Sequence, residues 1–411
     1  MSSHSSLPGA RLSAGVRAAQ DPRGRLIDAY VCLVGLLIAG YACFAPGIYH
    51  EWSAGDWLIN YQGGFVRRGL AGTPLLLLSR LSGLSPVLLS LLLGLLVYAV
   101  LLVSLRRLVR QSSRSVWVLA ALVSPAGLSF QLLDPYVGFR KELILLSALA
   151  WLLAYGEPLL RRRAATTVFM LVVCTLTILS HEGMICFLPY LFAALPVCGR
   201  GVRDSLRLCV LPCLAAVAAA ATCALHPGDA EIARRICASL GLSYATDGTS
   251  MCRGGPISFL GMSPAAARAQ TAQLIAFGHY WRLYPPLVVL ALLPALAGSR
   301  QLRAEGRTRG LRIVWLAAAA GWAGSLPLFL FAEDWGRWIY INALCLTLLL
   351  LRLDRCTRPL RAAQPLGALG RLRLAALALY GGLWTLPHFV WSVPERLGYV
   401  GLLATTARHM L

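Results

Sequence analysis

Long apolar runs separated by short polar segments make up most of this chain. Many runs approach the ~20 residues that an α-helix needs to cross a bilayer. They predict about eleven transmembrane helices, at residues 28–48, 86–105, 115–133, 142–157, 164–180, 184–198, 208–225, 283–298, 312–331, 338–353 and 374–391. Segment 73–84 is apolar but short, so we expect it to be re-entrant or to lie at the membrane interface.

The predicted fold class is therefore all-α, a polytopic bundle of transmembrane helices. A basic tail, 1–27, precedes the transmembrane domain, 28–392, which contains one long polar region at 226–282. A tail at 393–411 is expected to form an amphipathic helix. The first 25 residues lack the apolar core of a signal peptide, so the first helix is predicted to be an uncleaved anchor.

Composition supports the same class. Of the 411 residues, 58% are hydrophobic and 13% are charged, whereas soluble domains carry about 25% charged residues. The formal net charge is +21, but the arginines lie in short loops rather than on a soluble module, which argues against nucleic-acid binding.

The arginine-rich loops alternate along the chain and so predict an orientation. Basic residues gather in cytoplasmic loops of membrane proteins. The loops that would be cytoplasmic are the N-terminal tail, 106–114, 161–163, 200–207, 300–312 and 352–373. This places the N-terminus in the cytoplasm and the other loops on the periplasmic side of a bacterial inner membrane.

The cysteines indicate no metal centre. Most of the twelve lie inside apolar runs, and none forms a CxxC pair, so a zinc site is not indicated. Cys237 and Cys252 flank a polar stretch in the long outward region. They could form a disulfide in an oxidising compartment or remain two free thiols, and the sequence leaves both open.

Short polar clusters fall in the loops predicted to face outward. The first contains Asp56, Asn60, Arg67 and Arg68, with paired glycines between them. Guanidinium groups match the geometry of phosphate, and glycines allow the backbone to approach a ligand closely. This composition suits a phosphate ester beside a general base, although Asp56 could simply pair with one of the arginines.

The second and third clusters also suit an anionic ligand. After Asp134 come Arg140 and Lys141, the only lysine of the chain, at the start of a predicted helix, where anions are favoured. His181 and Glu182 lie between two predicted spans. Ionisable groups at membrane depth are functional candidates, so this pair could act as acid and base, orient a ligand or hold a divalent cation. The alternative is a buried histidine with satisfied hydrogen bonds.

The last cluster combines Glu333, Asp334 and Arg337 with two tryptophans. Adjacent carboxylates could hold a divalent cation or pair with the arginine, and the tryptophans could stack on sugar rings or form an interfacial belt. No P-loop or GxSxG motif occurs, so no cofactor is predicted beyond an optional cation.

The layout resembles the GT-C superfamily of integral-membrane glycosyltransferases, which take sugars from polyprenyl-phosphate carriers. Those enzymes place an acidic residue in the first outward loop, and Asp56 stands at that position, without the usual adjacent acidic partner. The resemblance implies that outward basic residues bind the carrier phosphate, with Arg67, Arg68, Arg140, Lys141 and Arg337 as candidates.

On this basis we expect a glycosyltransferase that moves a sugar from a polyprenyl-linked donor to a periplasmic glycan or lipid. Asp56, His181 and Glu182 are the predicted catalytic residues. The five basic candidates, with Asn60 and Asp334, are predicted to bind substrate, and Glu333 and Asp334 would hold any metal. The alternatives are an O-antigen or exopolysaccharide polymerase-like protein, a transporter of the polysaccharide or its lipid carrier, and a structural subunit of an envelope-assembly complex.

Overall fold

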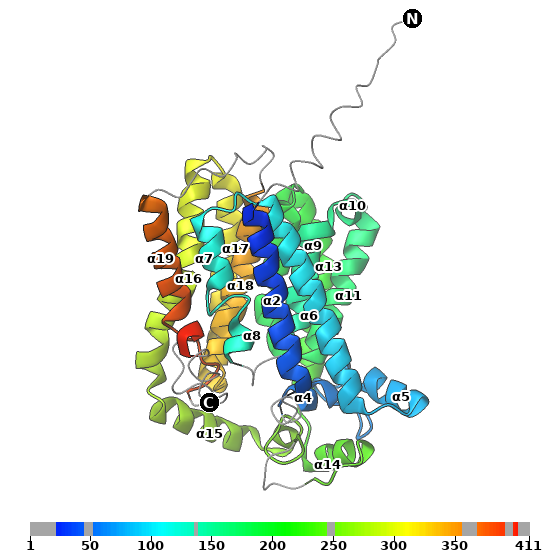
Figure 1. Ribbon diagram of the computed structural model, residues 1–411. Coiled ribbons are helices and arrows are strands. Elements are labelled where there is room, and N and C mark those ends of the chain that lie inside the picture. The colour runs from blue at the N-terminus through cyan, green and yellow to red at the C-terminus, as the bar shows by residue number, and fades with distance from the viewer. Residues whose placement is uncertain are drawn as a thin grey trace, which may run out of the picture.

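The protein is a bundle of helices that run roughly side by side, with shorter helices at the two ends (Figure 1). The computed structural model describes residues 22–44, 52–134, 139–244, 251–355, 368–390 and 398–401. Every element within these ranges is a helix, which confirms the all-α prediction. Most of the two predicted tails, 1–27 and 393–411, lies outside the described residues.

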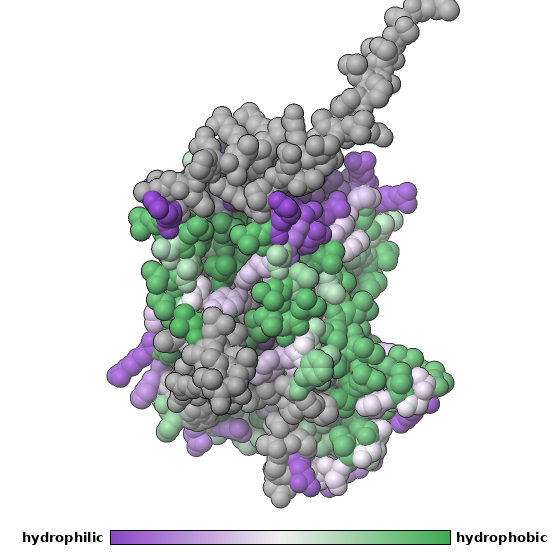
Figure 2. Space-filling view, in the orientation of Figure 1, coloured by the Kyte–Doolittle hydropathy of each residue, from purple (hydrophilic) through white to green (hydrophobic). Residues whose placement is uncertain are grey.

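Seven helices are long and apolar enough to span a membrane. They are α2 (Pro22–Phe44), α6 (Pro86–Gln111), α11 (Arg163–Ser180), α13 (Val202–Leu225), α16 (Tyr280–Ala304), α17 (Thr308–Phe331) and α18 (Trp335–Leu353). Each coincides with a predicted span. Hydrophobic residues form a belt around the visible face, with hydrophilic residues toward both ends (Figure 2). The chain is therefore a multi-pass membrane protein.

Three of the remaining predicted spans are shorter helices. Span 142–157 is α9 (Glu142–Tyr155), and span 184–198 is the 3₁₀ turn η3 (Glu182–Phe187) followed by α12 (Leu188–Val197). Span 374–391 corresponds to α19 (Ala368–Gly382), which ends well before residue 391. The chain after α19 returns instead to the start of α18, where Gly336 donates its backbone N–H to the His388 carbonyl at 3.1 Å.

The predicted single helix at 115–133 is wrong. It divides into α7 (Val116–Val123) and α8 (Phe130–Leu133). Pro125 lacks a backbone N–H and disfavours helix in the residue before it. Side chains stabilise the turn between them: the Ser124 hydroxyl accepts from the Ala126 N–H at 3.3 Å, and the Ser129 hydroxyl donates to the Ser124 carbonyl at 2.9 Å.

Helix α18 forms the centre of the bundle. Of its membrane-spanning window, 89% is buried, compared with 28–39% for the other six long helices. It packs against α9, α12, α16 and α17. Because α18 is enclosed on all sides, the polar residues that it carries lie inside protein rather than in lipid.

The region predicted as the outward loop, 226–282, is largely helical. It contains α14 (Ala230–Ser239), η4 (Ser258–Gly261) and α15 (Pro264–Phe277). The side chains of Asp229 and Ser263 accept backbone N–H groups at the starts of α14 and α15, as is common at exposed helix starts. Cys237 and Cys252 form a disulfide, which decides the alternative that the sequence left open.

The two ends of the bundle differ in content. The end with α4 (Ala54–Leu58), α5 (Gly72–Ser82), α14 and α15 carries the polar clusters described above and is called the cluster end (Figure 1). The opposite end, with α10 (Glu157–Leu160), carries the arginine-rich segments 106–114, 161–163, 200–207 and 300–312, which include helix ends, and is called the arginine end. Helix α5 exposes Leu77, Leu78 and Leu81, which fits the interfacial alternative for segment 73–84.

Candidate functional site

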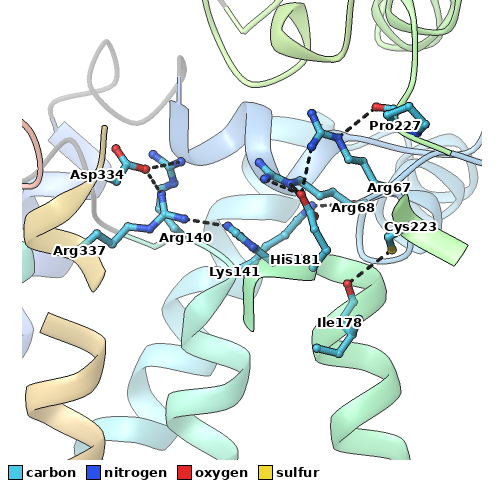
Figure 3. Close-up of polar contacts among 11 residues, drawn as sticks. Arg67, Arg68, Arg140, Lys141, Ile178, His181, Cys223, Pro227, Asp334 and Arg337 are labelled. Atoms are coloured by element: carbon cyan, nitrogen blue, oxygen red, sulfur yellow. Dashed lines mark hydrogen bonds and ion pairs between the residues drawn. The ribbon is translucent and has the colours of Figure 1, made fainter. Parts of the chain in front are cut away.

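Ten charged or titratable side chains meet at the cluster end, each from the end of a helix or an adjoining loop. Most of them are labelled in Figure 3. We call this set the charged cluster: Asp56 of α4, Arg67 and Arg68 before α5, Arg140, Lys141 and Glu142 at the start of α9, His181 between α11 and η3, Glu182 at the start of η3, and Asp334 and Arg337 at the start of α18. Their convergence follows from the fold, because each helix that contributes begins or ends there.

Glu182 binds both adjacent arginines. Arg68 donates to its carboxylate in a bidentate fork, with Nη2–Oε1 at 2.8 Å and Nε–Oε2 at 2.9 Å. Arg67 reaches Oε1 at 3.3 Å and also donates to the Pro227 carbonyl at 3.0 Å. The alternative in which Asp56 pairs with one of these arginines is not what the structure shows. Glu182 pairs with both and positions their guanidinium groups.

The backbone of Arg68 has a left-handed conformation, with φ at 67°. Non-glycine residues rarely adopt it, and they do so mostly where the surroundings enforce it. Here the Arg68 carbonyl accepts a hydrogen bond from Lys141 Nζ at 2.8 Å. Lys141 is fully buried, and burial lowers its pKa to about 8, against the attraction of Asp56.

Arg337 connects the other half of the charged cluster. Its guanidinium lies 2.6 Å from Asp334 Oδ2, 2.7 Å from His181 Nε2 and 3.4 Å from Glu142 Oε1, and only 1% of its side chain is exposed. Arginine can only donate hydrogen bonds, so Nε2 of His181 is the acceptor and its ring proton is assigned to Nδ1. His181 therefore orients Arg337 in this arrangement.

Asp56 is the least satisfied member. It is fully buried, and neither carboxylate oxygen has a hydrogen-bond partner among the described residues. Burial would raise the pKa of Asp56, but Lys141 and Arg140 outweigh burial and hold it well below its usual range. A buried carboxylate without hydrogen bonds is costly, so the Asp56 oxygens are free to accept from a ligand.

Arg140 is only loosely held. Its closest acidic partner is Asp334, at 3.9 Å, and its guanidinium lies 5.5 Å from the ring centre of Trp52. Its Nε has no hydrogen-bond partner among the described residues. Arg140 thus has donors to spare for an anion.

Two predicted residues lie apart from these contacts. Asn60 bonds the Leu58 carbonyl at 3.0 Å, Ser239 Oγ at 3.2 Å and the Gln62 N–H at 3.0 Å, which organises the loop after α4. Glu333 faces a separate pocket.

The structure does not favour a metal at Glu333 and Asp334. The Asp334 carboxylate forms an ion pair with Arg337 at 2.6 Å and is therefore not free to bind a metal. Within the part of the chain that the structure describes, no three His, Cys, Asp or Glu side chains come together as metal ligands would. The cluster contains instead more cations than carboxylates, a composition that suits an anionic ligand.

An apolar groove of about 750 Å³ lies beside the charged cluster. Its lining includes Trp57, Tyr61 and Leu70, the start of α5, and residues of α6, α9 and α11. Three lining residues, Leu96, Val100 and Leu176, are 63%, 37% and 38% exposed on the membrane-spanning surface. The groove therefore opens toward lipid, and Trp57 directly follows Asp56 in the chain.

No known relative guides the interpretation of this site. No protein-family model matches the chain, and no curated protein or solved structure matches it. The function must therefore be argued from the arrangement of the side chains.

Sequence reasoning gave no role to three residues that the structure connects to the site. Glu142 forms an ion pair with Arg337, and Trp52 lies under Arg140. His388 binds Asp134 through Nδ1 and its backbone N–H, at 2.8 and 2.7 Å. Glu142 could have been assigned from its position beside Arg140 and Lys141, but His388 lies in an apolar segment that gives no signal.

Proposed function

We propose that this protein is a membrane glycosyltransferase that transfers a sugar from a polyprenyl-phosphate donor to an outward-facing acceptor. One observation carries the proposal: a buried, unsatisfied carboxylate lies among cations directly beside an apolar groove open to lipid. A lipid-linked phosphate has the two parts that this arrangement suits, an apolar chain and an anionic head.

The balance of charge in the cluster supports an anionic ligand. Five basic residues face four carboxylates there; the basic residues are Arg67, Arg68, Arg140, Lys141 and Arg337, and the carboxylates are Asp56, Glu142, Glu182 and Asp334. The phosphodiester of a polyprenyl-linked sugar carries one negative charge and would balance the excess. Arg140 is the first candidate to bind it, because its guanidinium is incompletely paired.

In the proposed reaction an acceptor hydroxyl attacks the anomeric carbon of the donor sugar. The bond from that carbon to the phosphate oxygen breaks, and the phosphate leaves on the polyprenyl carrier with the electron pair. Asp56 takes the proton of the acceptor hydroxyl. Arginine and lysine side chains stabilise the negative charge that develops on the leaving phosphate.

The low pKa of Asp56 makes this role depend on donor binding. A general base works best with a pKa near the operating pH, and Lys141 and Arg140 hold that of Asp56 far lower. A bound phosphate would engage the same cations and weaken their effect on Asp56. Its pKa would then rise toward the range of an effective base, so that Asp56 is activated only when the donor is in place.

We further propose that the cluster end faces the periplasm and that the membrane is the bacterial inner membrane. The arginine-rich loops at the opposite end support this orientation. The disulfide at the cluster end supports an oxidising compartment on that side. An envelope-assembly complex is a candidate setting for the reaction.

Filling the groove tests the proposal. Ala148→Phe places a larger side chain in the groove, whereas Val172→Phe changes a residue of α11 that is 55% exposed. The assay is transfer of labelled hexose from a polyprenyl-phosphate donor to cell-envelope glycan by purified protein. We expect Ala148→Phe to raise the KM for donor by at least about tenfold, the equivalent of about 1.4 kcal/mol, and Val172→Phe to leave it unchanged. Absence of transfer by the unaltered protein with every polyprenyl donor would overturn the proposal.

A transporter of the same lipid-linked substrate is the second candidate. The interrupted segment α7–α8 favours it, because broken helices are common at transport sites. The charged cluster lies at one end of the bundle, however, and not near its middle (Figure 1). Movement of a polyprenyl-linked sugar across sealed vesicles without release of its sugar would favour the transporter.

A further inference from the structure

A second pocket, of about 470 Å³, adjoins the charged cluster and shares no lining residue with the apolar groove. We call it the aromatic pocket; Trp52, Tyr244, Phe259, Gln270 and Glu333 are among its lining residues. It shares a wall with the cluster, because the Trp52 ring also lies 5.5 Å from the Arg140 guanidinium and Glu333 precedes Asp334. Its volume is ordinary for a small-molecule site, about 300–1,000 Å³.

The segment around Cys252 forms one wall of this pocket and packs against α4, the helix that contains Asp56. Cys252 is bonded to Cys237 of α14, and the residues that follow it, including Gly254 and Phe259, line the pocket. The packing on α4 is close: a Cβ at Gly55 would lie 2.7 Å from Met251 Cβ. The pocket therefore has a fixed position relative to Asp56.

The lining has the chemistry of a sugar-binding site. The rings of Trp52 and Phe259 lie 5.4 Å apart and are tilted by 55°, so they present apolar faces to the C–H groups of a sugar ring. Tyr244 and Gln270 supply a hydroxyl and an amide at the pocket, and the amide both donates and accepts. Such a combination of a few polar groups on apolar walls is usual for ligand pockets.

Glu333 defines the charge of the ligand that would fit. Its carboxyl makes no hydrogen bond or ion pair with a described residue, and burial and Asp334 raise its pKa to about 7. Glu333 is the carboxyl among the lining residues, and when it is ionised it would repel an acidic sugar. The hydroxyls of an uncharged sugar could instead donate to Glu333 when it is ionised or accept from it when it is protonated.

We propose that the aromatic pocket binds an uncharged sugar unit of the acceptor glycan. This inference rests on the proposed glycosyltransferase function, in which the apolar groove and the charged cluster take the donor. A sugar in the aromatic pocket lies next to the cluster, so its hydroxyl can approach the Asp56 side. The pocket thereby selects the acceptor, while the groove selects the carrier.

Ligand-observed NMR with fixed sugar probes tests the proposal. The probes are maltotriose and N-acetylchitotriose, which are uncharged, and trigalacturonic acid, which is acidic; the protein is the full chain in lipid nanodiscs. We expect at least one uncharged probe to bind. Phe259→Ala and Gln270→Ala should each weaken that binding, the former by about tenfold or more, as expected for loss of an aromatic contact.

Phe277→Ala is the matched control, because Phe277 ends the same helix as Gln270, is 70% exposed and does not line the pocket. It should leave binding unchanged. Gln270→Ala and the conservative Glu333→Gln keep the test valid if Phe259→Ala does not fold. Binding of neither uncharged probe, preference for trigalacturonic acid, or equal binding by the folded pocket variants and Phe277→Ala would each overturn the proposal.

The experiments distinguish two outcomes: that the glycosyltransferase proposal is wrong, and that the proposal of acceptor binding in the aromatic pocket is wrong. If the protein is not a glycosyltransferase, uncharged probes still bind in the aromatic pocket while no polyprenyl donor transfers its sugar. If the pocket does not take the acceptor, transfer proceeds and Gln270→Ala leaves the KM for acceptor unchanged. When both proposals hold, Gln270→Ala raises the KM for acceptor and leaves the KM for donor unaltered.

Discussion

The two ends of the bundle contain ion pairs that differ in their exposure to water. At the arginine end, Asp28 pairs with Arg106 and Arg110, whose side chains are 45% and 46% exposed. At the cluster end, Arg337 and Glu142 form an ion pair with side chains that are 1% and 2% exposed. The pair of Arg337 and Glu142 is therefore removed from water, whereas the pairs of Asp28 with Arg106 and Arg110 remain accessible to it.

The difference shows which charges stability alone does not explain. Exposed pairs contribute about 0–1 kcal/mol and keep an arginine-rich loop soluble. Buried pairs often contribute no more than an apolar replacement would, because desolvation offsets their attraction. A buried network that also leaves Asp56 without hydrogen bonds is better explained by a ligand than by folding.

Removing one partner at each end should give the largest contrast. Arg337→Met leaves Asp334 and Glu142 without their main cation, and loss of one member of a buried pair costs about 3–5 kcal/mol. Arg106→Met removes an exposed pair and should cost no more than about 1 kcal/mol. Thermal unfolding of both variants in the same detergent measures the difference. Equal stability of the two would mean that burial does not distinguish the ends.

The disulfide should stabilise the cluster end by a smaller amount. It joins residues 15 apart in sequence, and closure of a loop of about 15 residues is worth about 3 kcal/mol in the chain-entropy description. Cys237→Ser should lower the unfolding temperature and expose the segment around α14 to protease. The control is Cys213→Ser, which changes a free cysteine of α13. Protease resistance equal to that of the unaltered protein would contradict the structural role of the disulfide.

Glu333 should give the smallest effect, visible as a dependence of stability on pH. Burial and the neighbouring Asp334 raise its pKa to about 7, against the opposing effects of His388 and Arg140. Because the folded pKa is above that of an unfolded glutamate, about 4.3, the stabilising contribution is present below pH 4.3 and is lost as pH rises to about 7. The unfolding temperature of Glu333→Gln minus that of the unaltered protein should therefore increase between pH 5 and 7.5. A difference that stays constant over this range would show that Glu333 does not titrate there.

Much of the fold could be predicted from the sequence because apolar length determines a membrane span. The seven long helices coincide with seven predicted spans. The prediction was wrong for span 115–133, and span 374–391 ends earlier than predicted, because local backbone chemistry and tertiary contacts determine both. Pro125 breaks the segment 115–133, and the chain after Gly382 leaves the helix to pack on the start of α18.

Most members of the charged cluster could be predicted from the sequence, but their pairing could not. Charges at helix ends on one side of a bundle must lie near one another, so Glu182, Arg337 and Asp334 were found from the pattern alone. Sequence could not show that Glu182, and not Asp56, binds Arg67 and Arg68. Nor could it identify Trp52 or His388, since such contacts form only when loops distant in sequence pack together.

One substitution at each end tests most directly whether the charged cluster exists for catalysis. Asp56→Asn keeps the size of the side chain but removes its ability to take a proton, and Asp28→Asn makes the same change at the arginine end. Rates of sugar transfer from a polyprenyl-phosphate donor and unfolding temperatures would be measured on both. We expect Asp56→Asn to remain folded and lose about 10²–10⁴-fold in rate, and Asp28→Asn to retain its activity. Full transfer activity in Asp56→Asn would contradict the account.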